Sequence, residues 1–210
     1  MPRKSFSRED PQTRRQHLID ATLAVIGRDG FSGATVRAIS VEADVTQGLI
    51  RHYFESKEDL VSAAYEYHMT RMTERSLSPL DDPEASARAQ LRHVVLNSVS
   101  AEVMSLANLT LWASFIAQVH TEEAIRRTHQ RTYLPFRDAF AGLIGAASAE
   151  AGHPLSAAEV RAKAVMCCAV LDGLWIEGAA LPEEYERAEI EDLALGAVRA
   201  LVGPALEPDP

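Results

Sequence analysis

Cysteine is scarce in this 210-residue sequence, and the two cysteines that occur, Cys167 and Cys168, are adjacent. Adjacent cysteines within a helix-like run provide neither the disulfide framework of a small secreted domain nor the spacing of a CxxC metal or redox site. We therefore expect both to be small residues of a hydrophobic core.

Long hydrophobic runs are also missing. The apolar stretch AVMCCAVL, residues 164–171, falls far short of the roughly 20 residues that cross a bilayer. The N-terminus has no apolar segment of the kind found in signal peptides. We therefore expect no membrane partner and a cytoplasmic location.

The motifs of common catalytic sites are absent as well. The sequence contains no G-x-S-x-G, no H-E-x-x-H, no phosphate-binding loop and no G-x-G-x-x-G. Its seven histidines lack the spacing of metal ligands. We expect no catalytic residue, no metal and no cofactor, although an all-helical enzyme with dispersed catalytic residues stays open as an alternative.

Basic residues are fewer than acidic ones: 21 Lys and Arg against 30 Asp and Glu give a net charge of -9. The excess of acidic residues lies in residues 61–210. Residues 1–60 carry nine basic and nine acidic side chains, whereas residues 61–210 carry twelve and twenty-one. Within the first 15 residues, five basic side chains oppose two acidic ones, and this basic arm is well placed to meet phosphates.

Helical periodicity is what the sequence does contain. Near the N-terminus Ile19, Leu23 and Ile26 recur at i, i+4 and i+7, and Gly30 ends the pattern as a C-terminal glycine does. The next helices start where a residue can cap them, at Thr35, at Thr46 and at Ser56. The pattern predicts helices over about residues 13–30, 35–43, 46–53, 56–78, 84–100, 102–120, 122–150, 156–180 and 187–202, with Pro135 kinking or breaking the longest.

The stretch TVRAISVEADVTQGLIRHYFESKEDL, residues 35–60, carries the strongest functional signal. Its two short helices can pack crosswise through their apolar residues, which leaves the polar side of the second helix free for an external partner. A helix fits the major groove of double-stranded DNA. We expect Gln47, Arg51 and His52 to contact bases, Gly48 to allow close approach, and Thr35, Thr46, Tyr53 and Lys57 to contact phosphates.

Gly48 has two possible explanations. A glycine inside a helix costs roughly 1 kcal/mol of helix propensity relative to alanine. The cost makes sense if a side chain would hold the helix away from DNA, and equally if another helix of the protein packs closely there.

Residues 14–60 resemble the DNA-binding domain of TetR-family transcriptional regulators. The resemblance rests on the threonine that starts the second helix, the VTQG entry into the third, the Tyr53–Phe54 pair and the start of the next helix at Lys57. Ser40 stands where alanine is usual, and Asp44 stands where the turn usually has glycine. Because aspartate tolerates a left-handed backbone better than most residues, the turn can still form.

The segments PQTRRQHLIDATL, LTLWASF and LDGLWIEGA resemble more narrowly the BetI-type branch of this family, whose founding members repress choline-to-glycine-betaine genes. Glu177 departs from this branch, because relatives often have an arginine there. If the resemblance extends to the ligand, it implies a small cationic effector, a quaternary ammonium compound or a polyamine. The candidate effector-binding residues are Trp112, Phe115, Tyr133, Asp172, Trp175 and Glu177.

Asp172 is the most informative of these residues. It lies in an otherwise apolar helical run, where a carboxylate is costly unless it is paired. The partner could be an internal arginine, such as Arg126, Arg127 or Arg131, or a cationic ligand. The aromatic residues could equally be ordinary core.

The predicted fold is all-α: a three-helix helix-turn-helix DNA-binding domain with its basic N-terminal arm (residues 1–60), a larger helical effector-binding and dimerisation domain (61–203) and a disordered tail (204–210). We expect a homodimer through the last two helices, about 156–180 and 187–202, with an apolar seam of Leu193, Leu195, Val198, Leu201 and Val202. A two-fold dimer implies a near-palindromic operator.

The leading functional hypothesis is a ligand-responsive regulator that represses transcription from that operator and is released by a small molecule. An architectural DNA-binding protein without a ligand is a second hypothesis, and the helical enzyme is a third. Architectural proteins tend to be small and basic throughout. The acidic segment 61–210 favours sensing and dimerisation instead.

Overall fold

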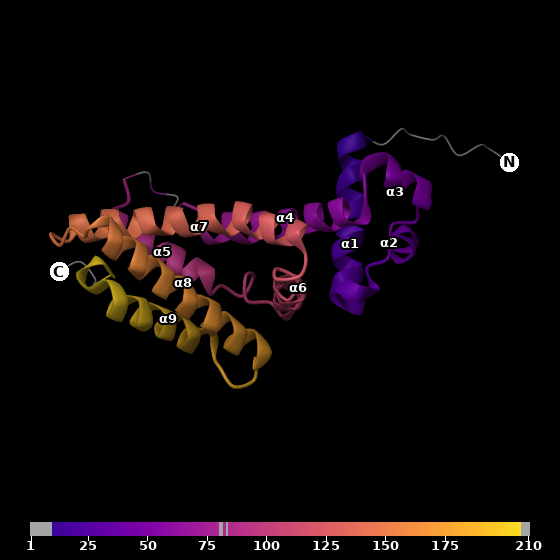
Figure 1. Cartoon of the computed structure of the whole chain (residues 1–210). Coiled ribbons are helices and arrows are strands. Elements are labelled where there is room, and N and C mark those ends of the chain that lie inside the picture. The colour runs from indigo at the N-terminus through magenta and orange to yellow at the C-terminus, as the bar shows by residue number, and fades with distance from the viewer. Residues whose placement is uncertain (1–9, 80–81, 83, 207–210) are drawn as a thin grey trace. The chain divides into compact units, whose positions relative to one another are not determined.

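The structure is a computed structural model that describes residues 10–79, 82 and 84–206. Over these residues it contains α-helices, one short 3-10 helix and no strand, which confirms the all-α prediction (Figure 1). Most of the basic arm lies outside the described residues. The helices are α1 (Pro11–Gly33), α2 (Val36–Glu42), α3 (Gln47–Tyr53), α4 (Lys57–Ser76), α5 (Ala87–Ser98), α6 (Leu106–Ile116), α7 (Glu123–Glu150), α8 (Ala157–Ala180), α9 (Arg187–Val202) and η1 (Gly203–Leu206).

The chain divides into two compact units. The first contains the residues up to Tyr67 together with Ala113–Thr128, and the second contains His68–Trp112 and the chain from His129 onward. The first division falls within α4, seven residues after the expected domain end at residue 60. The inclusion of residues 113–128 in the first unit was not expected, and it divides α6 between the two units.

The first unit is built around fully buried side chains of α1, α2 and α4, among them Leu18, Ile26, Ile39 and Leu60. The backbone of α1 leaves helical geometry at Gly30, with φ 75° and ψ 175°, which is a conformation that glycine adopts readily. The sequence therefore located the end of the regular helix correctly.

The part of α6 that belongs to the first unit contributes Phe115 to its core. The fully buried Phe115 ring stacks on Tyr65 of α4 at 4.3 Å between centroids and meets Phe31 edge-on at 6.3 Å. Burial also raises the pKa of the Tyr65 hydroxyl. These three rings tie residues 113–128 to the unit that contains α1 to α3.

The core of the second unit lies among α5, α7, α8 and α9 (Figure 1), with Leu91, Phe140 and Val198 fully buried. Cys167 and Cys168 are buried, as expected, and burial raises the pKa of the two thiols to about 11 and about 12. Both are therefore protonated and unreactive near neutral pH.

The structure excludes a break at Pro135 and corrects the expected start of the disordered tail. Helix α7 continues through Pro135 as one helix, so the proline does not break it. Residues 203–206, at the start of the expected disordered tail, form η1, in which Ala205 and Leu206 are buried against the core. Residues 207–210 lie outside the described residues. Within the described ranges, no helix has the length and apolarity that a bilayer crossing requires.

Candidate functional site

Helices α2 and α3 begin at the threonines that the sequence singled out. The Thr35 hydroxyl accepts a hydrogen bond from the amide of Ala38 at 3.1 Å, and the Thr46 hydroxyl accepts one from the amide of Leu49 at 3.3 Å. Between the helices Asp44 has φ 50°, in the left-handed region. The turn therefore forms with aspartate where glycine is usual.

Ser40, the other departure from the family pattern, is buried, but its hydroxyl is not left without a partner. The hydroxyl donates to the carbonyl of Arg37 at 2.8 Å. A buried polar group that is hydrogen-bonded in this way costs little. The substitution is thus accommodated within α2.

Helix α3 has one inner and one outer face. Ile50 is buried with Ile39 and Ala43 of the preceding segment, whereas Gln47, Gly48, Arg51 and His52 are exposed on the outer side. Their spacing at i, i+1, i+4 and i+5 places them on one side of the helix. The four residues expected to meet bases thus share one solvent-facing surface.

Gly48 is not required for packing within the protein. A Cβ atom built at this position would meet only the Thr46 hydroxyl oxygen, at 3.8 Å, which is an ordinary contact. The explanation by close helix packing therefore has no support in this structure.

The residues expected to contact phosphates lie at the starts of α2, α3 and α4 and at the end of α3. The capping hydroxyls of Thr35 and Thr46 are exposed, and each still has a proton to donate. Tyr53 is half-buried and meets the His52 ring edge-on at 5.2 Å. Lys57, at the start of α4, holds its ammonium 5.9 Å from the centre of the Phe31 ring.

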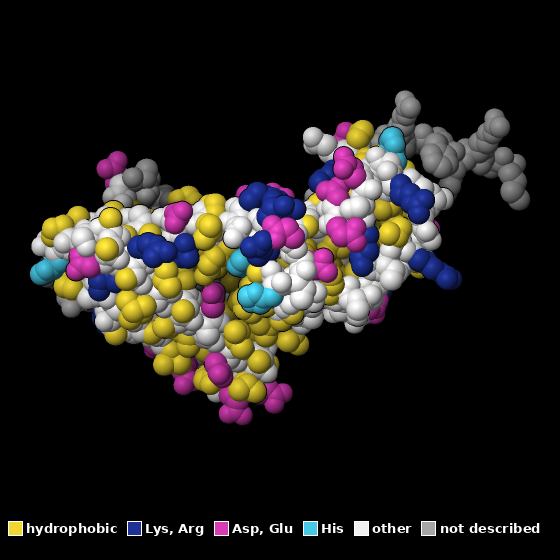
Figure 2. Space-filling model, in the orientation of Figure 1, with side chains coloured by type: hydrophobic (Ala, Val, Ile, Leu, Met, Phe, Trp, Pro, Cys, Tyr) yellow, Lys and Arg dark blue, Asp and Glu magenta, His cyan; other side chains and the backbone are white. Residues whose placement is uncertain are grey.

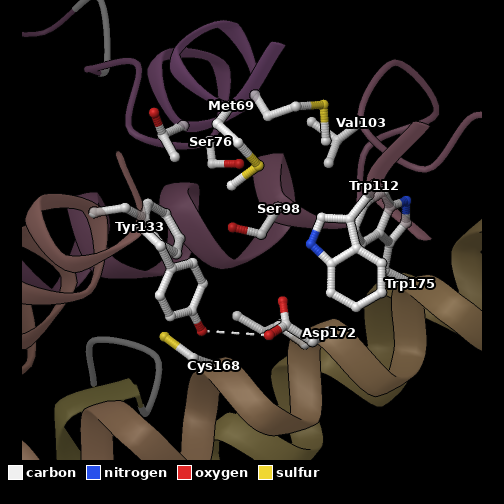
Figure 3. A pocket seen from close by; sticks show the side chains of 13 residues that line it. Met69, Ser76, Ser98, Val103, Trp112, Tyr133, Cys168, Asp172 and Trp175 are labelled. Carbon is white, nitrogen blue, oxygen red and sulfur yellow. Dashed lines mark hydrogen bonds between the residues drawn. The ribbon is translucent and has the colours of Figure 1, made fainter. Parts of the chain in front are cut away.

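The second unit contains a cavity of about 70 Å³. By volume it has room for roughly five to seven water-sized groups, which suits a small organic molecule. The labelled side chains in Figure 3 converge on it from α4, α5, α6, α7 and α8. Its lining consists of Met69, Met72, Thr73, Ser76, Ser98, Val103, Trp112, Tyr133, Phe136, Cys168, Leu171, Asp172 and Trp175.

Two indole rings form one end of this cavity. Trp112 of α6 and Trp175 of α8 lie 5.2 Å apart between centroids at an interplanar angle of 64°. Trp175 is almost fully buried, and its Nε1 has no hydrogen-bond partner among the described residues. A buried N–H group without a hydrogen-bond acceptor lowers the stability of the folded protein.

Asp172 is the carboxylate of the cavity. Its Oδ2 accepts a hydrogen bond from the Tyr133 hydroxyl at 3.3 Å, drawn as a dashed line in Figure 3. Burial raises the pKa of Asp172 to about 6, and the bond from Tyr133 opposes this rise. A neighbouring guanidinium would have lowered the pKa instead.

Two of the three arginines proposed as internal partners of Asp172 pair with another carboxylate. Arg126 and Arg127 both form ion pairs with Glu123, one turn earlier on α7. The positive charge that would complement Asp172 is therefore not supplied by this pair of residues.

Four of the six expected effector-binding residues line the cavity, and two do not. Phe115 lies in the core of the first unit against Tyr65, because α6 passes from one unit to the other between Trp112 and Ala113. Glu177 is exposed, and its carboxylate accepts a hydrogen bond from Tyr185 at 3.5 Å. Both expectations are corrected by these positions.

Several lining residues were missed by the sequence analysis. Met69, Met72, Ser76 and Ser98 were not predicted to line a site, and Cys168 was predicted to be an ordinary core residue. The spacing of Met69, Met72 and Ser76 at i, i+3 and i+7 is an ordinary inward-facing stripe, which does not distinguish a cavity wall from a filled core.

Of the five residues expected to form the apolar seam between protomers, three face the core of their own protomer. Leu195, Val198 and Val202 are buried in the core of the protomer itself. The apolar surface that is exposed lies on α8 and α9 (Figure 2) and includes Val165, Met166, Ile176 and Leu193, each at least 40% exposed.

Two family models match this chain. The model of bacterial regulatory proteins of the tetR family matches residues 18–64, and the model of the C-terminal part of BetI-type transcriptional repressors matches residues 87–203. The chain belongs to the TetR family of transcriptional regulators. Its BetI-type part spans more than half of its length.

Individual relatives agree with this assignment. The regulator is 30% identical over 179 residues to the HTH-type transcriptional regulator BetI of Serratia proteamaculans, covering 84% of this chain and 86% of that protein. It is 28% identical over 175 residues to the BetI regulator of Paraburkholderia phymatum, covering 83% and 86%. A crystal structure from Pseudomonas aeruginosa PAO1, described as a transcriptional regulator, has a TM-score of 0.85 at 33% identity and covers 94% of each chain.

These similarities confirm the leading hypothesis from the sequence. The protein is a BetI-type regulator of transcription, and TetR-family regulators bind DNA, usually as dimers, together with small-molecule effectors. The comparisons give no support to the architectural protein or to the enzyme.

Proposed function

We propose that the effector of this regulator is a small organic cation that binds in the cavity of the second unit and lowers the affinity for the operator. The observation that carries the proposal is Asp172, a half-buried carboxylate in a cavity whose lining contains no lysine or arginine. A buried carboxylate is stabilised when a positive charge is brought to it. The ligand would supply that charge.

The aromatic rings around Asp172 suit the same ligand. A cation over an aromatic face gains about 0.5 to 2 kcal/mol, depending on how far it is desolvated. Trp112, Trp175 and Tyr133 provide such faces within one cavity. Together with Asp172 they favour an amine or a quaternary ammonium group over an anion or a neutral polar molecule.

Proteins of this fold bind very different ligands. A regulator from Saccharomonospora viridis in complex with choline has a TM-score of 0.73 at 16% identity, and the regulator FadR from Bacillus subtilis in complex with stearoyl-CoA has a TM-score of 0.67 at 20% identity. The fold alone therefore does not select the ligand. The residues of this cavity favour the cation.

Choline and its neutral carbon isostere test the proposal as probes. We expect choline to change the tryptophan fluorescence and to weaken operator binding, because a tenfold weakening needs only about 1.4 kcal/mol of coupling. The neutral isostere should do neither at the same concentration. Equal responses to the two compounds would remove the cation site and leave the aromatic residues as ordinary core.

For the DNA side we propose that Gln47, Arg51 and His52 read base edges while Thr35, Thr46, Tyr53 and Lys57 contact phosphates. The continuous exposed surface of α3 and the outward position of the capping hydroxyls support this division of roles. Phosphate contacts fix the register on the duplex, and base contacts select the sequence.

We propose a homodimer through the exposed face of α8 and α9, which shares Leu193 with the seam expected from the sequence. On α9 this face contains Leu193, Gly196 and Ala200 at i, i+3 and i+7, and on α8 it contains Val165 and Ile176. Small residues beside larger apolar ones allow two helix pairs to approach closely.

Placing a charge on this face should separate the protomers. We expect Leu193→Glu to convert a dimer at micromolar concentration into a monomer, as measured by light scattering, because each dimer would bury two unpaired carboxylates. Leu106→Glu is the matched control, since Leu106 is an exposed leucine of α6 and belongs to neither of these two helices. A Leu193→Glu protein that stayed dimeric would rule out the proposed face.

A further inference from the structure

A second hollow adjoins the effector cavity. This outer groove is lined by residues from the end of α4, from the segment that follows it and from the middle of α7, namely Thr73, Glu74, Leu77, Ser78, Pro79, Thr132, Pro135 and Phe136. Thr73 and Phe136 also line the effector cavity. The two hollows therefore share a wall, and a ligand that passes Thr73 and Phe136 would extend from one into the other.

The charges along this path are all of one sign. Asp172 lines the effector cavity and Glu74 lines the outer groove, while neither lining includes a lysine or an arginine. Arg75, the neighbour of Glu74, pairs with Glu102 at 2.6 Å. The path thus has one carboxylate in the effector cavity and one in the outer groove.

The surfaces between the two carboxylates suit a flexible chain. Ser76 of α4 lies across the cavity from Asp172 (Figure 3), on the helix that also carries Thr73 and Glu74. Met72 and Phe136 provide apolar surface for methylene groups, and the hydroxyls along α4 can accept hydrogen bonds from N–H groups.

We propose that the effector is an elongated dication of the diamine or polyamine class, with one ammonium beside Asp172 and the other beside Glu74. This inference rests on the cation site proposed above and extends it to a second charge. Each methylene that the path buries should tighten binding roughly threefold to fourfold. The exposed pair with Glu74 should add only a few-fold, and less at high salt.

Matched series of amines test the inference. Butylamine, pentylamine and hexylamine are compared with putrescine, cadaverine and hexamethylenediamine, using tryptophan fluorescence and operator release of the full-length protein. At the chain length that reaches Glu74, the diamine should bind at least threefold more tightly than the monoamine. Glu74→Gln should abolish that preference while leaving choline and the monoamines unchanged.

Asp138→Asn serves as the control variant, because Asp138 is an exposed carboxylate of α7 that lines neither hollow. It should keep the preference for diamines. Two results would contradict the dication proposal and leave the single cation site in place. In the first, choline and the monoamines bind but no diamine binds more tightly; in the second, Glu74→Gln keeps the preference for diamines. If none of these cations binds or releases the operator, both proposals fail.

Discussion

Replacing Asp172 with asparagine is expected to weaken choline binding at neutral pH at least tenfold and, in the same protein, to make the ligand-free fold more stable. The loss of affinity follows because the variant offers the cation a neutral amide in place of a desolvated carboxylate. The gain in stability follows because folding no longer has to bury that carboxylate. Its pKa of about 6 in the folded protein, against an ordinary 3.8, corresponds to a gain of about 3 kcal/mol at most.

The pH dependence has a definite sign. Because the folded protein binds the Asp172 proton more tightly than the unfolded chain does, the stability of the unmodified protein should fall as the pH rises from about 4 to about 6. The Asp172→Asn protein should lack this contribution, so the difference between the two should be largest above pH 6. Choline affinity should show the opposite trend and rise as the carboxylate ionises.

Thermal unfolding at several pH values and a fluorescence titration with choline measure both effects. Glu177→Gln is the matched control, since it removes an exposed carboxylate from the same helix outside the cavity. It should change neither quantity appreciably. An Asp172→Asn protein that binds choline as tightly as before would contradict the cation site, whatever its stability.

The second large effect is expected at Gly48. Gly48→Ala should stabilise the free protein by up to about 1 kcal/mol, because alanine is the better helix former and its methyl group meets only the Thr46 hydroxyl at contact distance. The same methyl group should weaken operator binding at least tenfold if α3 approaches the base edges as proposed, because it points to the surface that faces the DNA.

Gly142→Ala provides the control for Gly48→Ala. Gly142 is an exposed glycine within α7, and a Cβ atom there would meet nothing within 4 Å. This variant should gain similar stability and keep its operator affinity, as measured by thermal unfolding and by gel shift. If Gly48→Ala behaves in the same way as the control, α3 does not approach the DNA at this point.

The sequence predicted the starts and ends of the helices well, because capping residues act on backbone groups only a few residues away. A threonine at the start of α2 and another at the start of α3 each bond an amide three residues ahead, so the caps are readable without knowledge of the rest of the fold. The glycine that ends the regular part of α1 works in the same way. Residues 203–206 form an ordered turn because two of their side chains enter a distant core, which no local pattern reveals.

The cavity was only partly predictable, because sequence spacing does not say which face of a helix is turned inward. Asp172 and Glu177 are five residues apart, so they point to different sides of α8, and only the first lines the cavity. Helix α9 has two apolar stripes, and its sequence alone does not show which of them faces the core of the protomer. The stripe of Leu195, Val198 and Val202 fills the core of the protomer, while the stripe through Leu193 and Gly196 is exposed.

The inclusion of residues 113–128 in the first unit matters for anyone who builds hybrid regulators by joining the DNA-reading part of one protein to the sensor of another. If only residues 1–60 of this protein were fused to another sensor, Tyr65 and its stacking partner Phe115 would be left out of the hybrid. The transplanted part would then meet a foreign residue where Phe115 belongs, beside Phe31. The first unit is discontinuous in sequence, so a working hybrid would have to carry α4 through Tyr67 and residues 113–128 along with α1 to α3.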